Sequence, residues 1–477
     1  MSFCRLVLAG KESLQYHQNG DLIQCVEKLH RLQKALSNVD KWELDTSVIW
    51  SVTSVLRGEI SKWDEFHDQP LPTQICLNVA AAALCCIRNT FHKCSRTQVL
   101  VAETPELLKP IVDTLQWTFT SRAPKNDALA KDDCSSNSSS EDEGTPRHQS
   151  KVFIEAHLGL ASACITCLGN LIANNKITRH LVWAHISGLM GNLLEYPDIE
   201  VAQMACMVLN NFLLETDIRE QICSSETLPA MMGSLTRLYQ YETRYACFSL
   251  FCLKRLLSDC NVLYKIWPTL GCQQKCLSMD VLTTMLENTD TNEGVVSDST
   301  ISVLVDKFKS GADKILTTHG GGLGSEEEAV NLVRLLTFIC TVAATDSRRK
   351  KIQQDASLLI TSVYLLRCIS EIGKVGNNEF TPIQELSLVD DEVVKNHPIF
   401  GFKSDLIRLI ASLVYQNKVN QNQVREINGI LLILESTQLD ARNPLIKENA
   451  VFAMKNLLEG NAENQKAISR LQLRGPA

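Results

Sequence analysis

The stretch that decides the fold is Val201-Ala-Gln-Met-Ala-Cys-Met-Val-Leu-Asn-Asn-Phe-Leu213. Its apolar residues recur at the three- and four-residue spacing that places them on one face of an α-helix. Asp198 stands just before the stretch as a natural N-cap, and Pro197 cannot continue a preceding helix. We therefore predict an amphipathic helix whose apolar face must be covered by other helices.

The end of this helix has counterparts elsewhere in the chain, at intervals of about forty residues. The copies are Leu168-Gly-Asn170-Leu-Ile, Leu209-Asn-Asn211-Phe-Leu, Leu253-Lys-Arg255-Leu-Leu and Met454-Lys-Asn456-Leu-Leu. Self-similarity at this period is typical of armadillo and HEAT repeats, which are pairs or triplets of helices that stack on their neighbours. The sequence predicts an all-α, armadillo/HEAT-like α-solenoid, a right-handed superhelix of helical repeats.

Charge and cysteine usage narrow the class of function. The formal net charge is −7, of which the segment 123–145 carries −4 (six acids and two lysines), so the rest of the chain is near neutral. We expect no nucleic-acid partner, because there is no basic stripe, and no membrane insertion, because there is no long uncharged apolar run. The eighteen cysteines are scattered among apolar neighbours, which indicates free thiols and a reducing, cytoplasmic location.

Cysteine and histidine spacings give no sign of a metal site. Cys164 and Cys167 have CxxC spacing, but no second pair lies at a matching distance, so we predict that both pack in the core. His180 and His185 do not share one helical face. We expect Trp183 and His185 to pack between repeats, and a binding role for Trp183 and His185 stays open. No cofactor is expected.

Three breaks interrupt the predicted array, at 121–150, 288–325 and 373–397. The first is acidic and Ser-rich and is predicted to be disordered. The resulting organisation is 1–120 (helical repeats), 121–150 (linker), 151–287 (central repeats), 288–398 (repeats with long loops), 399–470 (C-terminal repeats) and 471–477 (tail). Asn443-Pro444 is predicted to start the last long helix, Leu445 to Leu458, with Asn as its cap.

The C-terminal quarter resembles the ataxin-10 family. The resemblance begins with Gly401-Phe-Lys-Ser404 and Leu406-Ile-Arg-Leu-Ile410. It continues through Asn417-Lys418, Asn420-Gln421, Gly429-Ile430, Leu439-Asp440, Asn443-Pro444, Asn456-Leu457, Asn461, Asn464-Gln465 and Ile468. Fainter matches extend upstream to about Leu77.

This resemblance implies an armadillo-repeat cytoplasmic scaffold, perinuclear or at the centrosome, ciliary base or midbody, without catalytic residues. It implies protein partners, self-association, and roles in cytokinesis, the centrosome and ciliary base, neuron survival and neurite outgrowth. Two departures stand out: the acidic Ser-rich segment is not a recognised family feature, and the chain stops at Ala477 without a longer charged tail.

The recurring asparagine is the main candidate for partner binding. In similar armadillo folds an Asn of the third helix bonds to the backbone of an extended peptide in the concave groove. The alternative is that these amides bond within the repeat and fix the turn between helices. The candidate residues, including surface positions of the last two repeats, are Asn89, Asn170, Asn211, Arg255, Arg408, Lys418, Asn420, Gln421, Asn456, Asn464 and Gln465.

Two other classes of function stay open. A peptide- or cargo-binding import adaptor would pair each Asn with a Trp one turn earlier, but Cys85, Thr166, Met207 and Phe452 occupy those positions. A hidden enzyme or small-molecule carrier would need a cluster of His, Cys or acids that spacing does not reveal. We expect a non-enzymatic scaffold.

The acidic segment is also a candidate for phosphorylation. Acids follow Ser138, Ser139 and Ser140 by three residues, as an acidophilic kinase prefers, and Thr145 precedes a proline. Each phosphate would add about −1.5 to −2 charges. The alternative is an unmodified, solvated linker.

Overall fold

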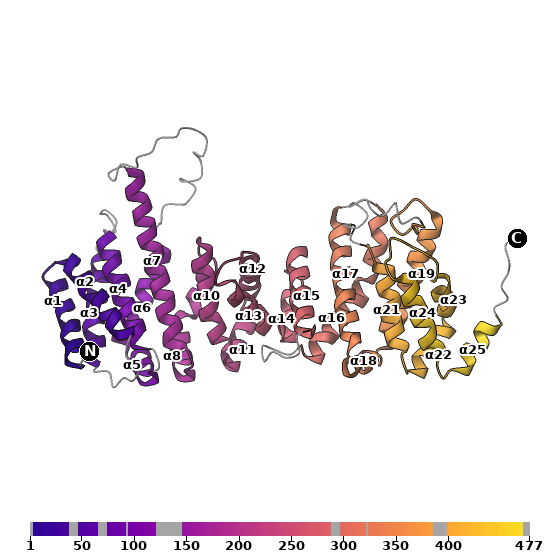
Figure 1. Ribbon diagram of the computed structural model, residues 1–477, viewed down its shortest axis with the longest axis horizontal. Coiled ribbons are helices and arrows are strands. Elements are labelled where there is room, and N and C mark those ends of the chain that lie inside the picture. Colours follow the sequence, from indigo (N-terminus) through magenta and orange to yellow (C-terminus); the bar gives the residue numbers. More distant parts are fainter. Residues whose placement is uncertain are drawn as a thin grey trace. The chain divides into compact units, whose positions relative to one another are not determined.

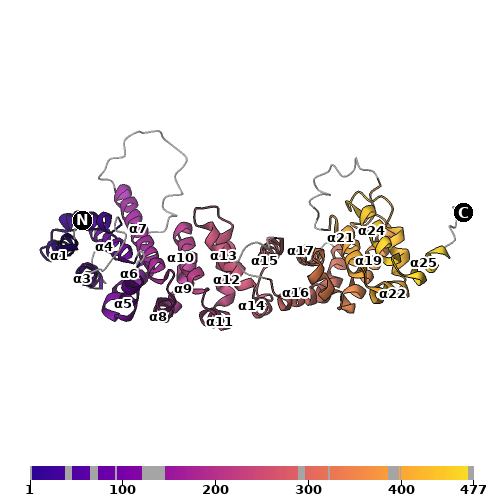
Figure 2. The same ribbon diagram turned by 60° about the horizontal axis from the view of Figure 1, so that its bottom comes forward.

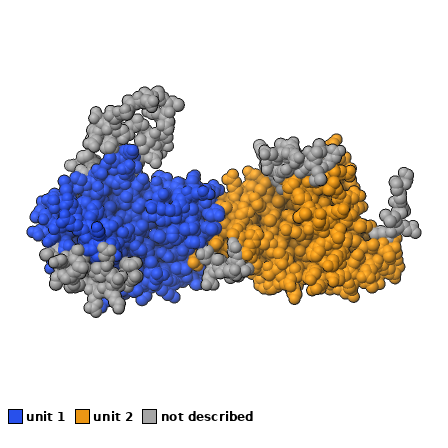
Figure 3. Space-filling model, in the orientation of Figure 1, with its two compact units in different colours: residues 1–252 blue, residues 253–477 orange. Residues whose placement is uncertain are grey.

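The computed structural model describes residues 3–37, 46–64, 74–91, 94–120, 146–287, 296–320, 323–384, 397 and 399–470. These ranges consist of helices joined by turns, and they contain no β-strand. They divide into two compact units, residues 1–252 and 253–477 (Figure 3), and the division falls within α13 (Ala246–Leu257). Each unit is an all-α stack of helices, as predicted.

The first unit contains the long helix α7 (Pro146–Ile172), which is followed by shorter helices (Figure 1). Its elements are α1 (Phe3–Gln18), α2 (Leu22–Ser37), α3 (Thr46–Asp64), α4 (Gln74–Thr90), α5 (Ser95–Glu103), α6 (Pro105–Thr120), α7 (Pro146–Ile172), α8 (Lys176–Ile186), η2 (Ser187–Leu189), α9 (Met190–Leu194), α10 (Ile199–Phe212), α11 (Thr216–Ser224) and α12 (Leu228–Tyr239).

The second unit also contains both short and long helices (Figure 2). Its elements are α14 (Cys260–Ile266), α15 (Cys272–Glu287), α16 (Asp298–Gly311), η3 (Ala312–Gly320), α17 (Leu323–Ala344), α18 (Asp346–Ile352), α19 (Ala356–Val375), α21 (Phe402–Val414), α22 (Lys418–Glu426), α23 (Gly429–Glu435), α24 (Ile446–Leu458) and α25 (Ala462–Ser469).

Equivalent helices of successive repeats lie side by side within each unit. The long helices α4, α7 and α10 pack in sequence in the first unit, and α15, α17, α21 and α24 do so in the second. Second rows are formed by contacts of α3 with α6, of α16 with α19 and of α19 with α23. Short helices meet too, α5 with α8 and α22 with α25. This is the nearest-neighbour packing of a helical-repeat solenoid; the predicted superhelix handedness stays a prediction.

The stretch that decides the fold forms α10, as predicted. The Asp198 side chain accepts a hydrogen bond from the Val201 N–H at 3.0 Å and so caps the helix. Leu209 and Phe212 are completely buried. Gly169 of α7 lies so close that an added Cβ would come within 2.7 Å of the Met207 side chain. The neighbouring repeats therefore interlock, and a larger residue at 169 would push Met207 aside.

The structure corrects three details of the sequence analysis. Residues 146–150, assigned to the disordered segment, begin α7; residues 121–145 lie outside the described part of the chain. The second predicted break contains α16, which the Ser297 side chain caps and whose apolar face is buried. Asn443 does not cap α24, which begins at Ile446 after Leu445 in the left-handed conformation. The Asn443 side-chain oxygen instead accepts hydrogen bonds from the backbone N–H groups of Lys403 and Ser404 in α21.

Two described helices are long and apolar enough to cross a membrane by composition: residues Lys151–Ile172 of α7 and Ala356–Val375 of α19. The shares of these windows that are buried inside the protein are 56% and 44%. α7 packs against α4 and α10, and α19 packs against α16, α21 and α23. Core helices of soluble proteins have the same composition, so the absence of membrane insertion stays a prediction.

Candidate functional site

The repeated motif lies where predicted, at the C-terminal ends of α7, α10, α13 and α24. Among its polar residues, Asn170 is exposed, and Asn211 and Arg255 are half-buried. Asn89 of α4 is also half-buried, and its side-chain amide donates to the Gln33 carbonyl at 3.0 Å. A peptide could therefore reach Asn170 and Asn211 but finds the amide group of Asn89 already bonded.

The C-terminal candidates are enclosed in a network of amide hydrogen bonds. Asn420, Gln421, Asn456 and Asn464 are buried, with at most 4% of their surface exposed. Asn420 donates to the carbonyls of Leu413 and Gln353. Asn464 makes the equivalent bonds one repeat later, to Leu457 and to Gln421. Their amides hold the ends of α21 and α24, an arrangement that fits the structural alternative for these positions.

Asn456 joins the same network from α24. Its amide nitrogen donates to the Ala411 carbonyl of α21 at 3.0 Å. Its side-chain oxygen is buried and accepts no hydrogen bond among the described residues. A buried unpaired acceptor costs free energy. The bond from Asn456 to Ala411 therefore holds α24 against α21 at a local cost in stability.

A recurrent glutamine was missed by the sequence analysis. Each of these glutamines is buried and donates its amide to two carbonyls at the end of a helix in the next repeat. The pairs are Gln98 with Asn170 and Ala173, Gln203 with Leu238 and Tyr241, Gln353 with Ser412 and Tyr415, and Gln421 with Asn456 and Glu459. The last carbonyls of a helix lack intrahelical partners, so these glutamines act as C-caps between repeats. Their irregular spacing in sequence hid them.

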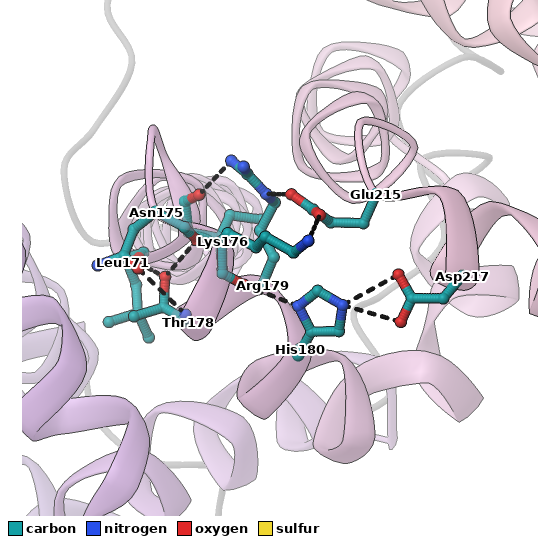
Figure 4. A network of polar contacts seen from close by, with 9 residues as sticks. Leu171, Asn175, Lys176, Thr178, Arg179, His180, Glu215 and Asp217 are labelled. Atoms are coloured by element: carbon teal, nitrogen blue, oxygen red, sulfur yellow. Dashed lines mark hydrogen bonds and ion pairs between the residues drawn. The ribbon is translucent and has the colours of Figure 1, made fainter.

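Charged side chains cluster between α8 and α11 (Figure 4). Arg179 Nε lies 2.6 Å from Glu215 Oε1, and both groups are nearly buried. Lys176 Nζ lies 3.8 Å from the second Glu215 oxygen. His180 Nε2 lies 2.8 Å from Asp217 Oδ2, closer to solvent. The cluster links α8 to the start of α11, which are short helices of neighbouring repeats.

His180, Glu215 and Asp217 are also close enough to hold a metal ion. Both Glu215 oxygens already face cationic side chains, and these would repel a metal. Hydrogen bonds to the Lys176 carbonyl and the Asp217 carboxylate raise the pKa of His180 above its ordinary value, and His180 lowers the pKa of the Asp217 carboxyl. The donor set therefore fits an ion-pair network better than a metal centre.

The CxxC pair packs in the core, and Trp183 of α8 packs against α10 of the next repeat, as predicted. Cys164 and Cys167 are fully buried free thiols, and burial raises the pKa of both. The Trp183 ring lies 5.1 Å from that of Phe212, and its Nε1 donates to Gln221 Oε1 at 2.9 Å. His185 does not pack between repeats: its side chain is exposed, because it lies beyond the buried stripe of α8.

The remaining candidates of the last repeats are exposed, and α24 of the same repeats carries an exposed apolar surface. Lys418 and Gln465 are exposed, and Arg408 is 47% exposed while paired with Asp405 at 3.0 Å. The side chains of Val451 and Phe452 on α24 are 55% and 47% exposed. They line a hollow of about 440 Å³ with Lys447, Glu448 and Lys455. The candidate phosphorylation sites Ser138, Ser139, Ser140 and Thr145 lie outside the described residues.

Comparison with known proteins places this surface in a family domain. Residues 402–477 match the family model described as the spinocerebellar ataxia type 10 protein domain. The resemblance to the ataxin-10 family is confirmed. Ataxin-10 of Xenopus tropicalis is 27% identical over 65% of this chain and 64% of its own length, and human ataxin-10 is 26% identical over 65% of each. The ataxin-10 homolog of Dictyostelium discoideum is 48% identical over 16% of this chain and 13% of its own.

The chain thus aligns with about two-thirds of the length of its animal ataxin-10 relatives. Among solved structures, a chain of the SYS-1/POP-1 complex aligns with this one over 96% of this chain and 75% of its own length, with 10% sequence identity and a TM-score of 0.37. A structure from work on cadherin and β-catenin covers 97% and 100%, with 13% identity and a TM-score of 0.30. Scores this low carry no argument; the helical-repeat assignment follows from the packing of the helices themselves.

Proposed function

We propose that this chain is a non-catalytic helical-repeat scaffold that binds protein partners through its C-terminal ataxin-10 domain. The main support is a contrast within α21–α25. The amides of Asn420, Gln421 and Asn464 are bonded to backbone carbonyls, which stiffens the domain. Val451 and Phe452 face solvent beside a hollow. Exposed apolar groups on a rigid frame are typical of a protein-binding surface.

The partner surface in this proposal has two parts. The apolar part is the hollow beside Val451 and Phe452, and it would supply most of the affinity. The polar part is formed by Arg408, Lys418 and Gln465, and it would select among partners. A second copy of the chain is one of the partners that we propose for this surface.

The finer role that we propose follows the family resemblance. It comprises cytokinesis, organisation of the centrosome and ciliary base, and neuron survival or neurite outgrowth, with a cytoplasmic location. Depletion in native cells, scored for binucleate cells and rescued with the wild-type chain, tests the first of these roles. Rescue by the wild type but not by the surface variants described next would connect the role to the C-terminal surface.

Affinity capture with the full-length chain tests the binding surface. The variants are Val451→Glu with Phe452→Glu, and Arg408→Glu with Lys418→Glu; Val375→Glu changes an apolar residue that is 83% exposed on α19 and serves as control. Quantitative mass spectrometry should show reduced capture for both double variants and not for the control. Light scattering on the same samples separates self-association from other partners. Equal capture by all variants would remove this surface from the proposal.

A further inference from the structure

The second unit has a hollow lined by lysines, apart from the C-terminal surface. Its volume is about 270 Å³. The start of α15, the end of α16, η3, the first half of α17 and the turn after α14 surround it. Its lining residues are Trp267, Lys275, Lys307, Ser310, Gly311, Lys314, Glu328, Asn331, Leu332 and Leu335. The lining therefore carries three cations and one anion, in a chain whose formal net charge is −7.

Two of these lysines lack a carboxylate partner. Lys314 pairs with Glu328. Lys275 and Lys307, by contrast, form no ion pair within the described ranges. The Lys275 ammonium lies 5.7 Å from the centre of the Trp267 ring, and the Lys307 ammonium lies 5.6 Å from that of Tyr264. Cation–π contacts of this kind hold a lysine in place without neutralising its charge.

Two nearby acids pair with other cations and not with these lysines. Asp280 on α15 pairs with Arg334 at 3.3 Å, and Asp306 on α16 pairs with Lys309 at 2.9 Å. The Asn331 side-chain oxygen accepts a long hydrogen bond from the Cys276 thiol at 3.6 Å, and its amide N–H groups donate to no acceptor within the described residues. The hollow is thus lined by residues that carry ammonium and amide donors.

We propose that this hollow binds an acidic peptide segment of a protein partner, with its carboxylates on Lys275 and Lys307. Leu332 and Leu335 are buried at the floor and offer an apolar contact for a neighbouring side chain of the peptide. The exposed ring of Tyr264, with 71% of its surface accessible, extends the site beyond the hollow. The inference rests on the proposed scaffold function and adds the chemistry of one partner segment at a second surface.

Fluorescence anisotropy with the full-length chain tests the proposal. The probe is a fluorescein-labelled peptide of four Asp-Glu-Leu repeats, and the matched neutral peptide has four Asn-Gln-Leu repeats. We expect saturable binding of the acidic probe that weakens as salt rises, and at least about tenfold weaker binding of the neutral one. No binding of the acidic probe, or equal binding of both peptides, would overturn the proposal.

Charge variants assign the binding to the hollow. Lys275→Glu with Lys307→Glu should weaken acidic-probe binding by about tenfold or more, and Lys275→Gln with Lys307→Gln by less. Lys350→Glu with Lys466→Glu makes the same charge change at two exposed lysines of the second unit and should leave binding unchanged. Equal losses in the Glu and control variants would mean nonspecific attraction, and the proposal would fail.

Two checks separate this proposal from others. Circular dichroism and melting temperature establish that each variant is folded; if the Glu pair unfolds, the Gln pair carries the test. A single-stranded RNA that displaces the acidic probe with higher affinity would assign the hollow to phosphate backbones and overturn the peptide proposal. The outcome is independent of the capture experiment, because the Val451 and Phe452 surface is unchanged in these variants.

Discussion

At the scale of single residues, polar side chains in the interior set the spacing of the repeats. Gln98 and Gln421 lie on the short helices α5 and α22, and Gln353 directly follows the short helix α18. All three close the carbonyl ends of long helices in the next repeat. A buried amide that satisfies two carbonyls fixes both distance and direction. The asparagines of the last repeats serve the same purpose, and the positions left for a partner are the exposed ones.

Removal of one glutamine cap should destabilise the second unit. Gln421→Leu leaves the Asn456 and Glu459 carbonyls without this donor and removes one of the two acceptors of the Asn461 amide. We expect a loss of about 1–3 kcal/mol in the free energy of unfolding, measured by urea denaturation. Gln465→Leu is the control, because Gln465 is exposed and water can replace its bond. Similar losses for the two variants would contradict the capping role.

The pair of His180 and Asp217 should be visible in a titration. The folded-state pKa of His180 is raised, so the pair stabilises the fold most fully below the unfolded pKa of about 6.5, and the contribution is lost as pH rises through the folded pKa. NMR titration should give a His180 pKa above the ordinary histidine value of about 6.5. In Asp217→Asn the His180 pKa should fall. An ordinary His180 pKa in the wild type would refute the ion pair.

At the scale of helices, apolar periodicity predicted helix positions more reliably than capping residues did. The stripe from Val201 to Leu213 predicted α10 almost to the residue, because burial of its apolar face decides where that helix lies. Asn443-Pro444 gave a wrong prediction for the start of α24. Asn443 caps a helix that lies about forty residues earlier in the chain: its side chain accepts from the first N–H groups of α21. α16 was missed because the surrounding Gly- and Thr-rich sequence obscured its short apolar stripe.

The candidate site was less predictable than the fold. The family motif pointed to the correct segment, residues 402–477. The motif could not distinguish an amide that faces a groove from one that bonds to a neighbouring repeat, because that depends on contacts made about forty residues away. Asn420 and Asn464 were therefore predicted to contact a partner, but their side chains are buried. Val451 and Phe452, which were not predicted, are exposed to solvent.

A charge in the stripe of α10 should disrupt the first unit. Leu209 is completely buried, and Leu209→Asp would lose roughly 2–5 kcal/mol of packing and add a desolvation cost. We expect thermal unfolding followed by circular dichroism to show a much weakened or absent cooperative transition. Leu214→Asp changes a residue that is 44% exposed and should have a small effect. An unchanged melting temperature for Leu209→Asp would refute the packing of α10.

At the scale of the whole molecule, the chain folds into two helical-repeat units, and the second unit carries two surfaces of different chemistry. The C-terminal surface is apolar with a polar rim, and the lysine-lined hollow of the second unit is cationic. Stacked repeats present side chains of many helices at once without closing over a ligand. This architecture suits a scaffold that holds extended protein segments.

The most direct test of the scaffold proposal is hydrogen exchange, measured by mass spectrometry on the full-length chain alone and bound to a partner from the capture experiment. The account predicts slower exchange on binding in α22 and α24, around Val451 and Phe452, with the buried network of Asn420 and Asn464 already protected in the free chain. Unchanged exchange throughout residues 402–470, with protection gained elsewhere, would contradict it.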